Sequence, residues 1–291
     1  MNRKLILGTV QFGLDYGINN SIGKPTNKNI YKILDYAYEN GIRTLDTAES
    51  YGNAHLIIGN YLKKNSKKKF KLISKLNSKQ ILNKGKLKFH IINKLKEFNI
   101  EYIHGYMIHD FKNFIQNEYL LKELESIKRE GFINIVGISL YENDEIVNVI
   151  NNYNNFDFIQ VPFNLLDNET RRGKVLKLAK KKNIKIFSRS TFLQGLFFKQ
   201  LNSFPSNLNP LKKYIKKIKN IQASSQTDIN SIALNYCLSK KYIDKVLIGV
   251  ESLSQLKKNL NDINNNNLDF KTEIDKMIVK ETSLLNPTNW N

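Results

Sequence analysis

Short apolar runs and amphipathic stretches alternate along the whole chain. The runs are rich in isoleucine, leucine, valine and phenylalanine without regular polar interruptions, which is typical of strands buried on both faces of a parallel sheet. They predict eight strands, at residues 5–9, 42–46, 70–75, 102–109, 133–139, 156–161, 184–190 and 245–249.

The amphipathic stretches have apolar positions three and four residues apart and predict helices. Because strands and helix-length segments alternate, consecutive strands are expected to lie parallel, and eight strands in 291 residues favour a closed barrel over an open sheet. We therefore expect one α/β domain over residues 1–291, a (β/α)8 TIM barrel. The predicted helices cover residues 29–40, 81–98, 117–130, 142–152, 169–182, 228–239 and 252–260.

Two segments depart from this alternation. Residues 193 to about 225 contain Pro205, Pro210 and several asparagines and serines, which predicts a long loop after the seventh strand. A loop at the carboxyl end of a strand is a candidate lid over a ligand. Near the end of the chain, the asparagine run 264–267 predicts a link to an extra C-terminal helix over residues 270–281.

The chain is strongly basic. Lysine and arginine outnumber aspartate and glutamate by 46 to 26, giving a formal charge of +20 and a pI near 9.7. This balance suits a polyanionic partner, but the lysines are spread over nearly every predicted helix and no nucleic-acid-binding motif accompanies them. We therefore expect no nucleic-acid partner. The alternative, nucleic-acid binding through the lysine-rich surface, predicts a steep salt dependence of affinity.

Composition also restricts the cellular setting. The single cysteine, Cys237, lies in a helical pattern and can form neither an internal disulfide nor a cysteine-based metal site. No stretch approaches the roughly eighteen apolar residues of a membrane span, and no secretion signal precedes the first predicted strand. We expect a cytoplasmic protein with no membrane partner and no metal.

Polar residues follow three of the predicted strands. Asp46, with Tyr51 nearby, then Lys75 and then His109 stand at strand ends that are about thirty residues apart, which suits one strand and one crossover helix. Because a parallel barrel gathers the carboxyl ends of its strands on one face, these side chains are expected to converge.

These residue types suit acid–base chemistry. A phenol has a pKa of about 10, so a catalytic tyrosine needs a nearby ammonium to lower it, and a carboxylate can hold that ammonium in place. An imidazole can orient a substrate carbonyl or relay the proton. Taken singly, each residue also has a structural explanation, such as an Asp46–Lys75 ion pair in the barrel mouth. Their coincidence at strand ends favours the catalytic interpretation.

The segment DTAESYG at 46–52 resembles the signature of the aldo-keto reductase superfamily. The segments ISKL at 73–76 and MIHD at 107–110 are similar to its other two catalytic segments, and further matches extend over almost the whole chain. The resemblance implies a (β/α)8 barrel that transfers a hydride between a nicotinamide dinucleotide and a carbonyl or alcohol. It also implies Tyr51 as general acid, Lys75 as the group that lowers its pKa, Asp46 as the partner of Lys75, and His109 as the substrate-orienting residue.

The resemblance further implies a set of cofactor contacts and some departures. An aromatic residue that stacks on the nicotinamide in many members is replaced by Arg189, and an arginine that grips the 2′-phosphate of NADPH is replaced by Gln255, with Lys257 and Lys258 nearby. The expected cofactor is NADPH, with NADH as the open alternative. The implied contacts are Ser139 and Gln160 for the carboxamide, Arg189 at the stacking position, Ser190, Leu193 and Gly195 for the pyrophosphate, and Gly249, Gln255 and Asn259 for the adenosine half.

The expected substrate is a small molecule. The segments 7–18 and 189–195 resemble a bacterial subgroup associated with sugars and surface polysaccharides, so we expect an NAD(P)-dependent oxidoreductase that acts on a sugar or related compound. The alternative is a regulatory or scaffold protein of the same fold that binds the dinucleotide with little turnover. Aromatic candidates for the substrate pocket are Phe12, Tyr16, Tyr141, Phe163 and Phe192.

Overall fold

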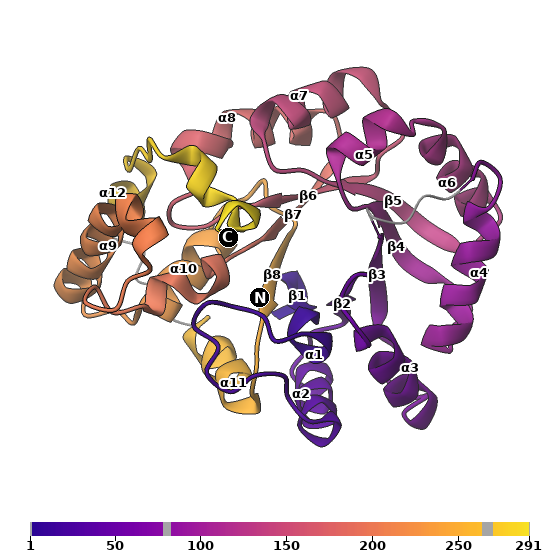
Figure 1. The fold of residues 1–291 in the computed structure, drawn as a ribbon, viewed down its shortest axis with the longest axis horizontal. Coiled ribbons are helices and arrows are strands. Elements are labelled where there is room, and N and C mark those ends of the chain that lie inside the picture. The colour runs from indigo at the N-terminus through magenta and orange to yellow at the C-terminus, as the bar shows by residue number, and fades with distance from the viewer. Residues whose placement is uncertain (1, 78–82, 264–269, 291) are drawn as a thin grey trace.

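Eight parallel strands close into a barrel in the computed structural model, which describes residues 2–77, 83–263 and 270–290. Each strand pairs with its neighbours in chain order, and β1 closes the barrel against β8 (Figure 1). The predicted (β/α)8 architecture is confirmed. The strands are β1 (Leu5–Gly8), β2 (Thr44–Asp46), β3 (Lys71–Leu76), β4 (Ile103–Ile108), β5 (Ile133–Ser139), β6 (Phe158–Pro162), β7 (Lys185–Arg189) and β8 (Lys245–Gly249).

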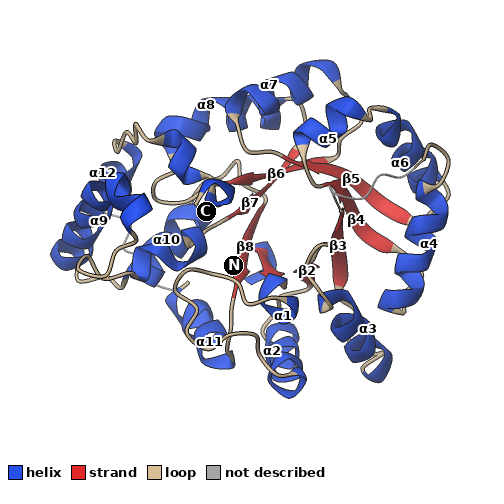
Figure 2. Cartoon of the chain, viewed as in Figure 1, coloured by secondary structure: helices blue, strands red, loops and turns tan. Residues whose placement is uncertain are grey.

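Helices surround the strands on the outside (Figure 2). The predicted helices that lie wholly in the described residues are found within two residues of their expected ends; α4 starts later than expected, at Leu87, and positions 81 and 82 lie outside the described residues. None of the described helices is long and apolar enough to cross a membrane. The helices are α1 (Val10–Gly13), α2 (Asn27–Glu39), α3 (Ala54–Lys64), α4 (Leu87–Phe98), α5 (Phe111–Gln116), α6 (Tyr119–Arg129), α7 (Asn143–Asn152), α8 (Glu169–Lys181), α9 (Lys212–Ser225), α10 (Ile229–Leu238), α11 (Leu253–Asp262) and α12 (Lys271–Asp275).

The apolar core has two layers. A small cluster fills the inside of the barrel, where Phe158 and Phe187 stack with ring centroids 4.6 Å apart. A much larger cluster packs the outer faces of the strands against the helices. Because the barrel interior is filled with side chains, ligands are restricted to its ends. The inner cluster consists of Ile6, Ile73, Met107, Phe158 and Phe187.

The predicted irregular segment 193–225 is only partly irregular. Its second half is α9, whose buried side chains Tyr214, Ile215, Ile218 and Ile221 recur at helical spacing. Pro205 and Pro210, which cap and interrupt the 3-10 helix before it, obscured this period in the sequence, as did the many lysines of the helix. The irregular connection after β7 is therefore confined to residues 190–211, with short 3-10 helices η2 (Leu193–Phe198) and η3 (Ser206–Leu211).

The extra C-terminal helix is shorter than expected. Helix α12 ends at Asp275, because the Asn168 side chain donates to the carbonyls of Ile274 (2.7 Å) and Met277 (2.9 Å) and so ties down the chain that leaves it. The C-terminal segment, drawn in yellow, lies beside α8 and α10 (Figure 1). The expected link at 264–267 lies outside the described residues.

Candidate active site

A cavity of about 600 Å³ opens at the carboxyl ends of the barrel strands. It reaches from the ends of β2, β3 and β4, where Tyr51, Lys75 and His109 line it, to the start of α11, where Gln255 and Asn259 line it. Its volume is within the range of small-molecule and cofactor sites. The predicted convergence of strand-end residues therefore produces a single cavity.

Lys75 and Asp46 form a buried ion pair at the floor of this cavity. The Lys75 ammonium donates to Asp46 Oδ2 and to the Thr47 carbonyl (3.1 Å), and each side chain of the pair is 2% exposed. The Gln160 amide donates to the other carboxylate oxygen of Asp46 at 2.7 Å. Burial lowers the pKa of Lys75, and the Asp46 carboxylate acts in the opposite direction. Asp46 thus fixes two cavity side chains, one from the adjacent strand β3 and one from β6 across the barrel.

Tyr51 lies above this pair. Its ring centroid is 5.2 Å from the Lys75 ammonium and 6.4 Å from the His109 ring centroid. Burial, and then the Asp46 charge, raise the pKa of the Tyr51 phenol well above its usual value, while the Arg189 charge acts to lower it. The phenol is therefore protonated at neutral pH, but the lowering of its pKa that the family resemblance assigns to Lys75 is not found, because burial has the largest effect.

His109 is a neutral imidazole in this setting. Burial lowers its pKa to about 3, and the Lys75 and Arg189 charges act in the same direction. Its Nδ1 atom is buried and has no hydrogen-bond partner in the described part of the chain. A neutral ring with a free nitrogen can bind a ligand oxygen or N–H without a change of charge.

Two amide oxygens in the cavity also lack partners. Gln160 Oε1 and Gln11 Oε1 are buried without a hydrogen bond to any described residue, and both side chains line the cavity. Gln160 turns its NH₂ group to Asp46, so its oxygen is left to accept from a ligand donor. An amide such as the carboxamide of a nicotinamide ring has the donor that Gln160 Oε1 needs. These residues therefore fit that class of cofactor.

The loop after β7 covers one side of the cavity in an unusual conformation. Ser190, Leu193, Gln194 and Gly195 all have positive φ, between 46° and 86°. A bulky residue such as Leu193 rarely adopts this conformation, and such strain is concentrated at functional sites. A Cβ on Gly195 would come within 2.7 Å of the Asn19 Cβ, so this loop is packed directly against the α1–α2 loop.

The far end of the cavity has a mixed lining. Gln255 is folded back on Glu251: its oxygen accepts from the Glu251 amide (2.8 Å) and its nitrogen donates to the Glu251 carboxylate (3.0 Å). Ser252 caps α11 by accepting from the Gln255 amide (3.2 Å). Gly249 lies against Gln11, since a Cβ there would be 2.8 Å from the Gln11 amide nitrogen.

Most of the residues selected from the sequence line this cavity. All four catalytic candidates, Asp46, Tyr51, Lys75 and His109, do so. Further residues of the cavity wall that were named from the sequence are Ser139, Gln160, Arg189, Ser190, Gly195, Gly249, Gln255 and Asn259 among the cofactor candidates, and Tyr16, Tyr141 and Phe192 among the aromatic ones.

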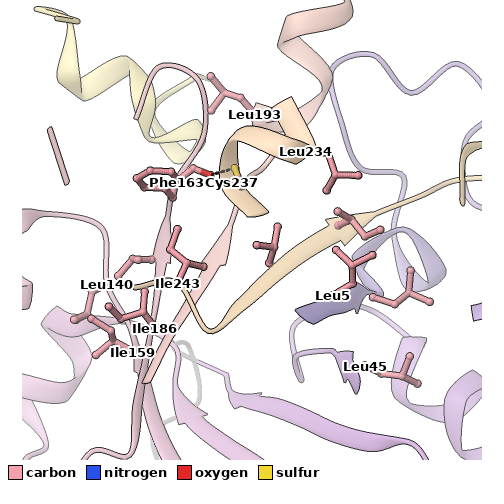
Figure 3. Packing of buried hydrophobic residues seen from close by; sticks show 14 of the residues in the cluster. Leu5, Leu45, Leu140, Ile159, Phe163, Ile186, Leu193, Leu234, Cys237 and Ile243 are labelled. Carbon is pink, nitrogen blue, oxygen red and sulfur yellow. Dashed lines mark hydrogen bonds between the residues drawn. The ribbon is translucent and has the colours of Figure 1, made fainter. Parts of the chain in front are cut away.

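Three selected residues lie in the core instead. Phe12, Phe163 and Leu193 are fully buried in the outer apolar cluster and do not line the cavity, so their assignment to substrate or cofactor contacts is corrected. Phe163 stacks on Tyr236 with ring centroids 5.6 Å apart, and its carbonyl accepts from the Cys237 thiol at 3.3 Å (Figure 3). Leu193 points into the same cluster (Figure 3), so it shapes the β7 loop through its backbone.

Other cavity residues were not identified from the sequence. Gln11 follows β1 just as Asp46 ends β2, so the strand-end rule was a sufficient signal for it. Thr288, from the C-terminal 3-10 helix η5 (Pro287–Asn289), gave no local signal, because it reaches the cavity through tertiary packing. The residues missed include Gln11, Asn19, Gln194, Phe198, Asn230, Glu251 and Thr288.

Comparisons with known proteins agree with this geometry. A model of the Aldo/keto reductase family matches residues 4–277, and the chain belongs to this family. It is 25% identical over 287 residues to the uncharacterized oxidoreductase YqkF of Bacillus subtilis (strain 168), covering 90% of this chain and 91% of YqkF. It is also 26% identical over 163 residues to the uncharacterized oxidoreductase YrpG of the same organism, a match that covers 50% of this chain and about half (47%) of YrpG.

A solved structure shares the fold. The holo form of aldo-keto reductase AKR11C1 from Bacillus halodurans superposes with a TM-score of 0.73 at 20% identity, covering 96% of this chain and 94% of that one. Family membership implies an oxidoreductase that uses a nicotinamide dinucleotide.

Proposed function

We propose that this protein reduces the carbonyl group of a sugar or a related small molecule, with Tyr51 as the proton donor. The supporting observation is that Tyr51, the Lys75–Asp46 pair and His109 meet at one end of a cavity that continues to the start of α11. A bound nicotinamide dinucleotide supplies the hydride. The bacterial subgroup that the sequence resembles supports a sugar-like substrate.

Each residue has a separate part in the proposed reaction. The buried Tyr51 phenol keeps its proton at neutral pH and passes it from Oη to the substrate oxygen as that oxygen gains charge. The Lys75 ammonium, fixed by Asp46 and the Thr47 carbonyl, stabilises the phenolate that is left. The neutral His109 ring orients the carbonyl by a hydrogen bond. The Gln160 oxygen, which is buried without a partner in the described residues, would accept a hydrogen bond from the nicotinamide carboxamide and so hold the cofactor.

Turnover of an aldehyde and sugar panel tests this assignment. Tyr51→Phe should lower kcat by roughly 10² to 10⁴-fold while the dinucleotide still binds, because general acid catalysis contributes about that much. Tyr36→Phe, a half-buried tyrosine outside the cavity, is the matched control. Unaltered activity in Tyr51→Phe contradicts the assignment of Tyr51 as the proton donor. Tight dinucleotide binding with negligible turnover across the panel supports the regulatory or scaffold alternative instead.

The charges near the start of α11 support NADH over the NADPH expected from the family resemblance. The Glu251 carboxylate lines this end of the cavity, and the Lys258 ammonium is paired with Asp228 at 3.0 Å. Lys257 does not line the cavity, and its ammonium lies 5.4 Å from the ring centroid of Tyr36. A carboxylate suits a ribose 2′-hydroxyl and repels a 2′-phosphate.

Direct titration of NADH and NADPH, followed by the fluorescence of the bound nicotinamide, measures this preference without turnover. The protein should bind NADH more tightly, and Glu251→Gln should improve NADPH binding about tenfold by removing a like charge. Glu101→Gln, an exposed position outside the cavity wall, should change neither affinity. Equal affinities for the two dinucleotides in the unmodified protein contradict the preference for NADH.

A further inference from the structure

Arg189 presents a positive charge to the cavity and has no acidic partner among the residues that the structure describes. Its guanidinium lines the cavity wall. Within the described part of the chain it forms only long hydrogen bonds, at 3.4 Å, to the Ser190 hydroxyl and to the Leu140 carbonyl. Across residues 2–77, 83–263 and 270–290 it makes no ion pair with a carboxylate. A guanidinium has five N–H donors, so most of its capacity is left for a ligand.

The Arg189 charge acts at the reactive end of the cavity. It lines the same cavity as Tyr51, Lys75 and His109, and it is among the charges that lower the pKa of each of them. The Lys75 charge is balanced there by Asp46. The reactive end therefore carries a net positive charge, which comes from Arg189.

The Arg189 guanidinium is held in place by the Tyr141 side chain, on which it stacks. Its Cζ atom lies 3.9 Å from the ring centroid of Tyr141. The Tyr141 carbonyl accepts from the Arg172 guanidinium, and the Tyr141 amide donates to Glu145 at 2.7 Å. Arg172 itself is fixed by Asp167, at 2.6 and 2.8 Å, so the support under Arg189 is rigid. A fixed, unpaired guanidinium is suited to bind an oxyanion with two parallel hydrogen bonds.

We propose that the substrate of this enzyme is an anionic carbonyl compound, such as a sugar acid or a sugar phosphate, and that Arg189 binds its carboxylate or phosphate. This inference rests on the proposed function, because it places the reacting carbonyl beside Tyr51. It replaces the family-based expectation that Arg189 stacks on the nicotinamide. A neutral sugar leaves the guanidinium unpaired, so Arg189 selects for charge.

Substrate pairs that differ in charge test the proposal. Glyceraldehyde 3-phosphate is compared with glyceraldehyde, and glucuronate with glucose, as the ratio of kcat/KM within each pair. The protein should prefer the anionic member of at least one pair, and Arg189→Leu should reduce that ratio by about 100-fold, since hydrogen bonds between charged groups are strong. Arg129→Leu, an exposed arginine at the end of α6, should leave the ratio unchanged.

Arg189→Lys distinguishes a site for phosphate from a site for carboxylate. A lysine ammonium keeps the point charge but loses the planar pair of donors, so a preference for phosphate should largely survive and a preference for carboxylate should fall. Ratios that are unchanged in Arg189→Leu overturn the proposal. Weaker NADH and NADPH binding in that variant with unchanged ratios assigns Arg189 to the cofactor instead, and also overturns it.

A binding readout covers the case in which none of the panel turns over. The dinucleotide-loaded protein is titrated calorimetrically with glycerol 3-phosphate, gluconate and glycerol. Tighter binding of either anion than of glycerol, lost in Arg189→Leu, supports the proposal, and equal binding of all three overturns it. Failure of NADH and NADPH themselves to bind contradicts the proposed function rather than the role of Arg189.

Discussion

Gly13 lies directly against the backbone carbonyl of Tyr51. A Cβ atom at Gly13 would be 1.8 Å from that oxygen and 2.9 Å from the Ala54 amide nitrogen, so the α1 segment and the loop that carries Tyr51 touch backbone to backbone. Gly13→Ala should push Tyr51 away from the Lys75 ammonium. We expect kcat to fall about 10²-fold, because a shift of about 1 Å in a reacting group has that effect, and stability to fall by about 1–3 kcal/mol.

Gly23→Ala is the control for Gly13→Ala. Gly23 is in the following loop, has φ of +74°, and has open space around its Cβ position. Alanine there should cost about 1 kcal/mol through backbone strain and leave kcat unchanged. Steady-state kinetics and urea denaturation of both variants make the comparison. Equal kcat in Gly13→Ala and Gly23→Ala contradicts the positioning role.

Glu49 holds the same loop from the other side. Its carboxylate, 5% exposed, accepts from the Tyr106 hydroxyl and from the Asn77 amide (3.2 Å), and lies 2.9 Å from His90 Nε2. Glu49→Ala should therefore lower the free energy of unfolding by about 3 kcal/mol, because several buried groups lose a charged partner. Tyr106→Phe removes one donor and should cost about 1 kcal/mol. Equal losses of unfolding free energy in Glu49→Ala and Tyr106→Phe, measured by urea denaturation, contradict this account of the cluster.

The strands and the positions of the catalytic candidates at the barrel mouth were predictable because each is specified locally. A continuous apolar run indicates a strand buried on both faces, and a polar residue at its end, such as Asp46 or Lys75, indicates the mouth of the barrel. The helix α9 was missed because lysines lie between its buried positions, such as Ile215 and Ile218, and prolines precede it, so its helical period is hard to detect in the sequence.

Other features depend on tertiary contacts that leave no local pattern. The sequence does not show whether an aromatic side chain lines a pocket or fills a core. Phe163, which is in the core, and Tyr141, which lines the cavity, were therefore equivalent candidates. The left-handed backbone of Leu193 is imposed by its loop and is contrary to the preference of leucine. That no acidic residue in the described ranges pairs with Arg189 can be seen only when its surroundings are known.

The neutral state of His109 predicts a pH dependence of stability. Burial holds its pKa at about 3, below the usual 6.5, so the unfolded chain binds the proton more readily. This contribution to stability is complete above about pH 6.5 and is lost as the pH falls toward about 3. His109→Gln should therefore lose less stability between pH 7 and pH 4 than the unmodified protein, as measured by urea denaturation at a series of pH values.

His104 provides the comparison for His109. It lies near the start of β4, at the opposite end of the barrel, and burial together with the Lys71, Lys185 and Lys245 charges lowers its pKa to about 4. His104→Gln should reduce the same acid dependence of stability while leaving kcat/KM intact. His109→Gln should reduce both the acid dependence of stability and kcat/KM. An unchanged pH dependence in both variants contradicts the assignment of neutral histidines.

Arg172 links the stability of the barrel rim to the proposed selection for anionic substrates. It is 1% exposed, pairs with the buried Asp167, and donates to the Tyr141 carbonyl beneath Arg189. Arg172→Met should cost about 3–5 kcal/mol, because Asp167 loses its closest partner in the interior.

The double variant Arg172→Met/Asp167→Leu separates the two roles of Arg172. It removes both charges and should recover much of the lost stability, because a buried ion pair replaced by apolar side chains is often neutral in cost. It does not restore the donor to the Tyr141 carbonyl, so the preference for the anionic member of each substrate pair should stay reduced in both variants. Urea denaturation and the kcat/KM ratios measure the two effects. Recovery of the substrate preference together with stability shows that Arg172 has no part in positioning Arg189.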